Sequence, residues 1–159
     1  ADMSNITKDK LLRAAKRGNL KVLKKWKNKN PRDDHGSIKD DNGKTLLHRS
    51  CSKGHLACVK YLLKSSSTYI NIQSNYGSTP LVSACWNGHL DCVKYLVEAC
   101  NADISIPGFR GATAFQCTFH HGHLDCAKYL VDSCDADIDV RDTQGLTPLQ
   151  WACSRGHLD

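Results

Sequence analysis

A glycine recurs along most of the chain at a constant interval of 34 residues, at Gly43, Gly77, Gly111 and Gly145. A Gly-His pair keeps the same step at 54–55, 88–89, 122–123 and 156–157. Such a period is the sequence signature of a chain built from stacked copies of one small supersecondary unit. We therefore expect an elongated array in which each unit packs on its neighbours.

Each interval carries the pattern of two short helices. In the second copy, Thr79 is the expected N-cap and Pro80 the first helical residue, and Gly88 ends this helix. A second helix is expected from about His89. Its apolar side chains fall at helical spacing on Cys92, Val93, Leu96 and Cys100. Because a helix pair of this size cannot bury such a face alone, neighbouring units must cover it.

These residues resemble the ankyrin repeat, whose pattern is a turn with Gly, then Thr-Pro-Leu-His, Gly-His and an apolar helix. The four copies read Thr45-Leu46-Leu47-His48, Thr79-Pro80-Leu81-Val82, Thr113-Ala114-Phe115-Gln116 and Thr147-Pro148-Leu149-Gln150. The resemblance implies an all-α solenoid of stacked helix-turn-helix units with hairpin-like turns. His48 alone keeps the histidine, so weaker turn hydrogen bonding is expected in copies two to four. Asn101 and Asp135 replace the usual Gly after the second helix, where a left-handed conformation is expected.

The resemblance also divides the chain. Residues 1–3 are set aside, because Ala1 and Asp2 ahead of Met3 look like a cloning remnant. The divisions that follow are an N-terminal capping repeat and connector (4–40), three repeats (41–74, 75–108 and 109–142) and a partial fourth repeat (143–159). Since the chain ends at the start of a second helix, we expect a monomeric domain of a larger protein.

Motifs that carry catalysis do not occur in the sequence. It has no Gly-rich phosphate loop, no Gly-x-Ser-x-Gly and no His-Glu-x-x-His, and its single glutamate is Glu98. No enzymatic activity and no cofactor are therefore expected. Nine cysteines, an odd number, without a secretory signal favour an intracellular location, cytoplasmic or nuclear, with reduced thiols.

Cysteine and histidine are frequent enough to raise the question of a metal site. Two sets of cysteines recur at equivalent positions in successive units, namely Cys58, Cys92 and Cys126, and Cys51, Cys85 and Cys153. Packed units lie about 10 Å apart, too far for one zinc ion. We expect small buried side chains and no metal. The resemblance gives the Gly-His histidines a structural role between units, and a solvated pair is the favoured interpretation of His120 and His121.

The resemblance implies that turn tips and exposed first-helix positions form a concave face that binds a partner. The corresponding residues here are Asn42, Lys53, Asn75, Tyr76, Trp86, Asn87, Phe109, Arg110, His120, His121, Gln144 and Arg155. The same positions include Asp41, Lys44, Ser52, Ser78, Ala112, Thr143, Leu146 and Ser154. Aromatic and arginine side chains are enriched among interface hot spots. We therefore predict a non-catalytic protein-protein interaction module that binds a protein or peptide, with Tyr76, Trp86, Phe109 and Arg110 as anchors.

The positive charge is concentrated at the N-terminus. The net charge is +6, whereas residues 1–32 alone carry about +9. A basic cluster surrounds Trp26 and comprises Lys21, Lys24, Lys25, Lys27 and Lys29. It permits an alternative function, electrostatic attachment to anionic phospholipid at a membrane surface or to nucleic acid. The competing interpretation places Leu20, Leu23 and Trp26 on the buried face of a capping helix, and an acidic protein would suit the lysines equally. A third alternative is a regulatory domain of a larger enzyme or channel.

Overall fold

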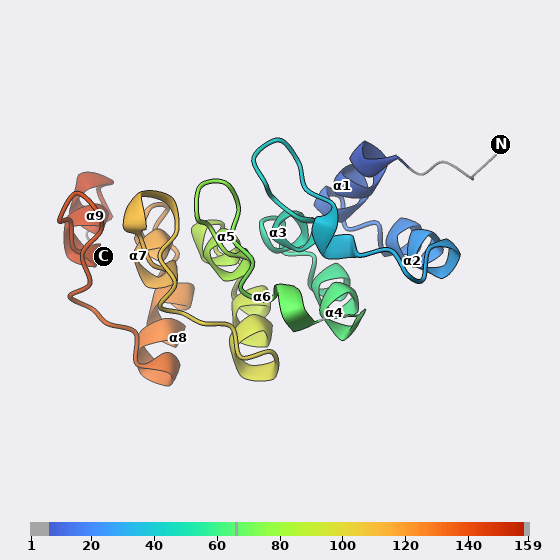
Figure 1. The fold of residues 1–159 in the computed structure, drawn as a ribbon. Helices are drawn as coiled ribbons and strands as arrows, with labels where there is room; N and C mark the ends of the chain where they lie inside the picture. The colour runs from blue at the N-terminus through green and yellow to red at the C-terminus, as the bar shows by residue number, and fades with distance from the viewer. Residues whose placement is uncertain (1–6, 66, 158–159) are drawn as a thin grey trace.

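The computed structural model describes residues 7–65 and 67–157, and in them the chain is a row of stacked helix pairs (Figure 1). The first helices of the pairs are α1 (Lys8–Lys16), α3 (Leu46–Cys51), α5 (Pro80–Trp86), α7 (Ala114–Phe119) and α9 (Pro148–Ser154). The second helices are α2 (Leu20–Lys29), α4 (Leu56–Ser65), α6 (Leu90–Lys94), continued by the π-helical turn η3 (Tyr95–Ala99), and α8 (Leu124–Cys134). Short 3₁₀ turns are η1 (His35–Ser37), η2 (Ser67–Tyr69) and η4 (Phe109–Gly111). The predicted all-α solenoid is confirmed.

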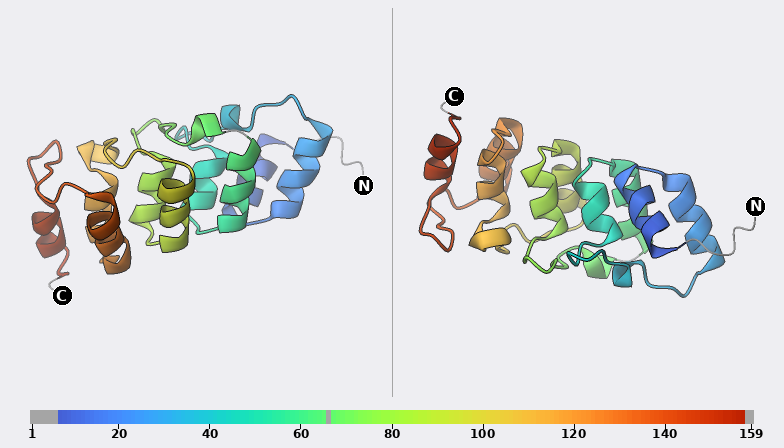
Figure 2. Two further views of the ribbon diagram at one scale, coloured as in Figure 1. Left: turned by 90° about the horizontal axis from the view of Figure 1, so that it is seen from below. Right: turned by 90° about the horizontal axis from the view of Figure 1, so that it is seen from above.

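The helices form two layers. Each first helix contacts the first helix of the next pair, and each second helix contacts the next second helix. Both views in Figure 2 show the pairs following one another in chain order, with α1 and α9 far apart along the row. The hairpin turns before α3, α5, α7 and α9 project at one edge, as predicted (Figure 1). No helix in the described ranges has the length and apolar character needed to cross a membrane.

A threonine begins each first helix from α3 onward. Thr45, Thr79, Thr113 and Thr147 each accept a hydrogen bond from the amide three residues later. Pro80 and Pro148 open two of these helices as predicted. The two helices without proline are stabilised by a capping box, in which the third helical side chain returns a bond to the threonine amide.

The turns between helices need the left-handed conformation. Gly88 has φ 70°, and a Cβ there would lie 2.3 Å from Nδ1 of His123, so neither the backbone nor the space admits a side chain. Asn101 (φ 54°) and Asp135 (φ 52°) take this conformation after the second helices, as predicted.

The core is one continuous strip of apolar side chains from Leu11 to Trp151. Six cysteines lie in it, namely Cys51, Cys58, Cys85, Cys92, Cys117 and Cys126. Burial raises the pKa of Cys117 to about 12, so this group stays a neutral thiol. Cys153 is exposed, against expectation, because no described helix packs over its side of α9. All nine cysteines are free.

The histidines of the Gly-His pairs join successive units. The Nε2 atom of His55 lies 3.0 Å from the Lys16 carbonyl oxygen, and His89 and His123 make the corresponding contacts one and two units later. The predicted structural role of these histidines is confirmed. Each one ties the turn between two helices to the end of the preceding first helix.

A second set of hydrogen bonds joins the hairpins. It is made by the fourth residue of the Thr-Pro-Leu-His pattern, which is His48 in the first repeat. Its Nδ1 accepts from the Thr45 amide (3.2 Å) and its Nε2 lies 2.8 Å from the Ser78 carbonyl oxygen. Gln116 replaces both functions, because its Oε1 accepts from the Thr113 amide and its Nε2 donates to the Leu146 carbonyl (2.9 Å).

The expectation of weaker turn bonding is therefore wrong for the third and fourth copies. Gln150 also accepts from the amide of its threonine, at 2.8 Å. An amide presents an acceptor and a donor at nearly the reach of an imidazole, which explains the substitution. In the second copy Val82 has no polar side-chain atom at this position, and the Gln73 side chain bonds to the Gly77 and Pro107 carbonyl oxygens instead.

Candidate functional site: a groove between the middle repeats

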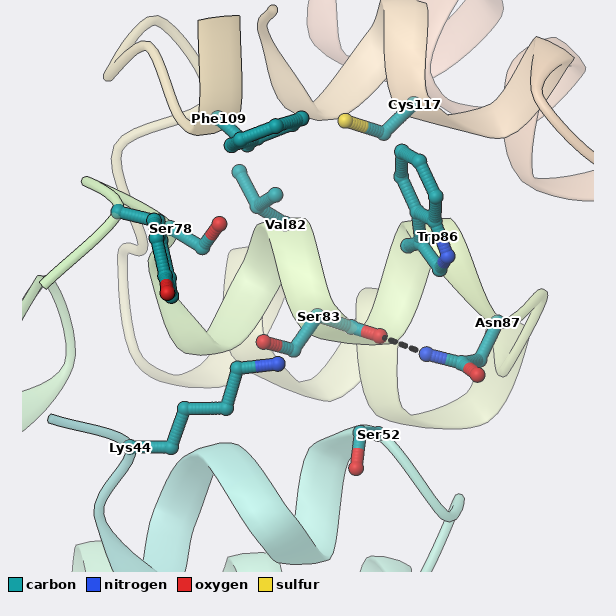
Figure 3. Close-up of a pocket in the computed structure, with 10 residues that line it drawn as sticks. Lys44, Ser52, Ser78, Val82, Ser83, Trp86, Asn87, Phe109 and Cys117 are labelled. Atoms are coloured by element: carbon teal, nitrogen blue, oxygen red, sulfur yellow. Dashed lines mark hydrogen bonds between the residues drawn. The ribbon is translucent and has the colours of Figure 1, made fainter. Parts of the chain in front are cut away.

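We call the surface made by α3, α5, α7 and α9 with their preceding hairpins the first-helix face. A groove of about 310 Å³, open to solvent, lies on it between the first and third repeats (Figure 3). Its lining residues come from three repeats and are Lys44, Ser52, Tyr76, Ser78, Val82, Ser83, Trp86, Asn87, Phe109 and Cys117. The predicted contact residues Tyr76, Trp86, Asn87 and Phe109 are thus brought together at one place.

The groove exists because the middle repeats have small side chains where the outer repeats have large ones. At equivalent positions on the first helices stand Arg49, Ser83, Cys117 and Trp151. Arg49 forms an ion pair with Asp40 at the base of its hairpin, and the Trp151 indole donates to Asp142 (2.9 Å). Ser83 and Cys117 make no such link, so the surface between hairpin and helix stays open.

The hairpins on either side of the groove are also joined differently. Backbone hydrogen bonds connect hairpin 40–44 to hairpin 74–78 and hairpin 108–112 to residue 143. No corresponding bond joins Tyr76 and Phe109, whose rings meet edge to face with centroids 6.1 Å apart. These two side chains remain 55% and 44% exposed, among the most exposed large apolar groups in the described residues.

Trp86 forms the opposite wall and is half-buried. Its ring stacks on His120 with centroids 3.9 Å apart. A guanidinium only donates, so the 2.6 Å contact between Arg155 and Nε2 of His120 leaves the histidine proton on Nδ1. That Nδ1 is buried and has no partner among the described residues. Burial, followed by the charge of Arg155, lowers the pKa of His120 to about 4.

The expectation of a solvated pair therefore holds only in part, because His120 is half-buried. The stacked indole of Trp86 shields the His120 ring from water on one side, and no sequence pattern predicted this contact. His121 is exposed, as predicted.

The remaining predicted contact residues lie around the groove. Asn42, Lys53, Gln144 and Arg155 are exposed. Arg110 is exposed at a hairpin tip with φ 58°, and its guanidinium lies 5.2 Å from the Phe109 ring centroid.

Two predicted contact residues also have local structural partners. The Asn75 side chain donates to the Asp41 carbonyl, and that of Asn87 to the Ser83 carbonyl. Sequence reasoning did not identify Val82, Ser83 and Cys117 as contact residues. A comparison of the four copies at the position of Arg49 and Trp151 would have found the last two.

The N-terminal lysines lie far along the row, on the second helix of the first pair (Figure 1). Trp26 is buried with 8% exposure, as the competing interpretation of a capping helix predicts. Lys27 donates to the Asp33 carbonyl, and Lys24 lies over the Tyr61 ring at 5.9 Å. Lys21, Lys25 and Lys29 are exposed.

The chemistry offered by the described residues is that of a binding surface. Among them, no group of three or more His, Cys, Asp or Glu side chains lies where it could hold a metal ion. The groove combines aromatic rings, an aliphatic floor at Val82, serine hydroxyls and one ammonium group, that of Lys44.

Comparison with protein families agrees with this architecture. One family model, described as ankyrin repeats in three copies, matches residues 11–108, and a second, described as ankyrin repeats in many copies, matches residues 113–159. A search among curated proteins returned no match. The first match includes α2 and most of α1. The chain belongs to the ankyrin repeat family.

Proposed function

We propose that this chain binds a partner protein or peptide on its first-helix face, which the family resemblance makes the concave face, with the groove as the central anchoring point. Ankyrin repeats are generally protein-protein interaction modules and typically have no enzymatic activity. The proposal accordingly assigns no catalytic role. The observation that carries it is the exposed ring pair of Tyr76 and Phe109 at the mouth of an apolar groove.

The energetics of these rings favour a partner. Burying the exposed part of an aromatic side chain contributes on the order of 1–2 kcal/mol, and aromatic residues at the centre of an interface are frequent hot spots. Tyr76 and Phe109 hold each other in place, and Trp86 is held by His120. Little side-chain freedom remains to be lost on binding, which lowers the entropic cost of association.

The polar residues around the groove complete the proposed interface. Asn42, Arg110 and Gln144 lie on the hairpin side, whereas Lys53 and Arg155 lie at the helix ends. A polar rim around an aromatic centre is the usual arrangement in protein interfaces. We propose that the rim selects the partner and that the groove supplies most of the affinity.

The test uses peptides of about twelve residues selected from a random library against the purified protein, long enough when extended to span about 40 Å, or four repeats. Fluorescence anisotropy then measures the affinity of the selected peptides for variants. We expect Tyr76→Ala and Phe109→Ala each to weaken binding at least about tenfold, or about 1.4 kcal/mol.

Ile138→Ala is the matched control, because it removes an exposed apolar side chain far from the groove. It is expected to leave affinity unchanged. The Trp86 indole also packs on the core, so Trp86→Ala is expected to lower the thermal stability as well as the affinity. Its affinity is therefore measured at a temperature at which both the variant and the parent protein are folded. Selected peptides that bind Tyr76→Ala and Phe109→Ala as tightly as the parent protein would contradict the proposal, as would a library that yields no binder.

A further inference from the structure

We propose that the partner segment is an acidic, extended peptide that places one aromatic or aliphatic side chain in the groove and carboxylates on either side of it. This inference rests on the proposed function, because it assumes that the first-helix face is the docking surface. It adds the chemistry and the spacing of the ligand.

The two layers of the solenoid differ in charge over the middle repeats. The stretches 45–55, 79–89, 113–123 and 147–157, which run from each capping threonine to the Gly-His histidine, contain no Asp or Glu. The acids of the two middle repeats, apart from the hairpin residue Asp142, lie on the second helices and the segments after them, at Asp91, Glu98, Asp103, Asp125, Asp132, Asp135, Asp137 and Asp139. An acidic ligand is therefore repelled by the second-helix layer at α6 and α8 and admitted by the first-helix face, whereas α2 and α4 carry lysines and no acid.

Acids in the hairpins do not cancel this difference. Asp40 and Asp142 each accept from two amides of their own hairpin and from a side chain of the following helix. Their charges are thus already compensated by hydrogen-bond donors. Asp41 is left as the exposed carboxylate of these turns, at the end of the array away from Arg155.

A row of cationic and neutral polar side chains follows the first-helix face at the positions just before the turn glycines. Its members are Arg17, Lys53, Asn87, His121 and Arg155, and all are exposed. Neither Lys53 nor Arg155 forms an ion pair with a described residue. A carboxylate of a ligand can therefore approach these two groups without displacing an acid of this chain.

The spacing of this row suits an extended chain. Neighbouring repeats are separated by about 10 Å, the usual distance between packed helices, and an extended peptide advances about 3.3 Å per residue. Every third residue of the peptide then meets the next member of the row. Because the groove centre lies at the repeat of Asn87, Lys53 is one repeat away on one side and Arg155 two repeats away on the other, so we expect one acid about three residues from the buried side chain and another about six residues from it on the opposite side.

Lys44 provides an additional contact inside the groove. It is half-buried, and its ammonium group points across the groove toward Ser83 (Figure 3). No described carboxylate pairs with it, in contrast to Arg49, which pairs with Asp40. An ammonium beside an apolar wall attracts a carboxylate more strongly than one in open solvent, because less water screens the charge.

The same features favour a peptide over a nucleic acid. A nucleic acid carries a phosphate at every nucleotide, whereas the middle of this row is the neutral Asn87, next to a groove whose walls are aromatic and aliphatic. A peptide with one apolar side chain between two separated carboxylates matches an apolar groove that has a cationic side chain on each side.

The library selection described above also tests this inference. Selected peptides are expected to be enriched in Asp and Glu about three residues from an aromatic or aliphatic residue on one side and about six residues from it on the other. Lys53→Glu and Arg155→Glu should each weaken binding about tenfold, and the parent protein should lose affinity as salt is added. Lys64→Glu makes the same charge change on an exposed second-helix position and should leave affinity within about twofold.

The outcomes separate this inference from the proposed function. Selected peptides that are neutral or basic but still require Phe109 would overturn the acidic ligand and leave the docking face intact. Peptides that require neither Phe109 nor Tyr76 would overturn both. An oligothymidine of about twelve nucleotides that binds more tightly than every selected peptide would overturn the choice of a peptide.

Discussion

The hairpins of the outer repeats differ from those of the middle repeats in how they are held. In hairpins 40–44 and 142–146, which we call braced, an aspartate accepts two amides of the turn and a side chain of the next helix. Hairpins 74–78 and 108–112, which we call open, have Ser74 and Gly108 at this position. The Ser74 hydroxyl is buried and has no partner among the described residues.

The difference extends to the links between hairpins. His48 joins the first hairpin to the second, and Gln116 joins the third to the fourth. Val82 stands at the equivalent position between the two open hairpins and cannot make this link. The exposed Gln73 side chain joins the two segments instead, because its Nε2 donates to the Gly77 and Pro107 carbonyl oxygens (2.8 and 3.2 Å). The link through the first helix that His48 and Gln116 make is thus missing where the groove lies. We infer that the outer repeats supply stability and that the middle repeats give up part of it for an open binding surface.

The largest expected effect comes from removing a brace. Asp142→Ala deletes hydrogen bonds from the Gln144 and Leu146 amides and leaves the buried Trp151 indole without its acceptor. Because bonds to a charged group are strong, the free energy of unfolding should fall by about 3 kcal/mol. Urea denaturation followed by circular dichroism measures this change.

Ser74→Ala is the matched substitution in an open hairpin. Its hydroxyl makes no bond to a described residue, so the free energy of unfolding should change by less than about 0.5 kcal/mol. Equal losses in Asp142→Ala and Ser74→Ala would remove the distinction between braced and open hairpins.

The two hairpin links should differ in their response to pH. Burial lowers the pKa of His48 to about 4, whereas an unfolded histidine has a pKa of about 6.5. Between these values the unfolded chain binds a proton that the folded chain does not, so stability falls as pH falls. The contribution of His48 to the loss between pH 7 and pH 5 should be about 2 kcal/mol.

His48→Gln tests this contribution, because Gln116 shows that an amide makes the same two bonds. At pH 7 the variant should unfold within about 1 kcal/mol of the parent protein. At pH 5 it should be the more stable of the two. An unchanged difference between the two proteins at both pH values would show that His48 does not titrate on unfolding.

A glutamine at position 82 should give the open pair of hairpins the first-helix link that His48 and Gln116 provide elsewhere. Val82→Gln supplies an acceptor for the Thr79 amide and a donor toward the third hairpin, as Gln116 does one repeat later. The gain should be about 1 kcal/mol in unfolding free energy. Since Val82 forms part of the groove floor, affinity for selected peptides should fall about tenfold.

Val82→Thr controls for the change in polarity. Threonine keeps the shape of valine, and its hydroxyl is too short to reach the next hairpin. It should leave the groove open and peptide affinity within about threefold, even if burying the hydroxyl lowers stability by about 1 kcal/mol. Loss of affinity in Val82→Thr equal to that in Val82→Gln would show that polarity, and not closure of the groove, weakens binding.

The period of the glycines predicted the helix pairs, the stacking and the hairpin edge, because these depend on residues that recur in every copy. The walls of the groove also followed from the repeat, since Tyr76, Trp86 and Phe109 stand at positions exposed in each unit. The floor was not predicted. It depends on what the two middle copies lack. Positions 74 and 108 have no aspartate, and positions 83 and 117 have no large side chain. The shielding of His120 by Trp86 is a contact between repeats and has no local signal.

The smallest expected effect concerns the open hairpin around Arg110. This residue is left-handed (φ 58°), whereas the equivalent Tyr76 and Gln144 do not have positive φ. Glycine relieves the left-handed strain but gains freedom in the unfolded chain, so Arg110→Gly should raise stability by about 0.5 kcal/mol. Gln144→Gly should lower it by a similar amount, because no strain is relieved there.

Thermal melts of both variants measure these opposite shifts. Arg110→Gly should also weaken acidic peptides a few-fold, since it removes a cation beside Phe109, and the strained conformation would then be a cost accepted for binding. A loss of stability in Arg110→Gly would instead mean that the contact of the guanidinium with the Phe109 ring outweighs the strain, and would place part of the stability of the array in an open hairpin.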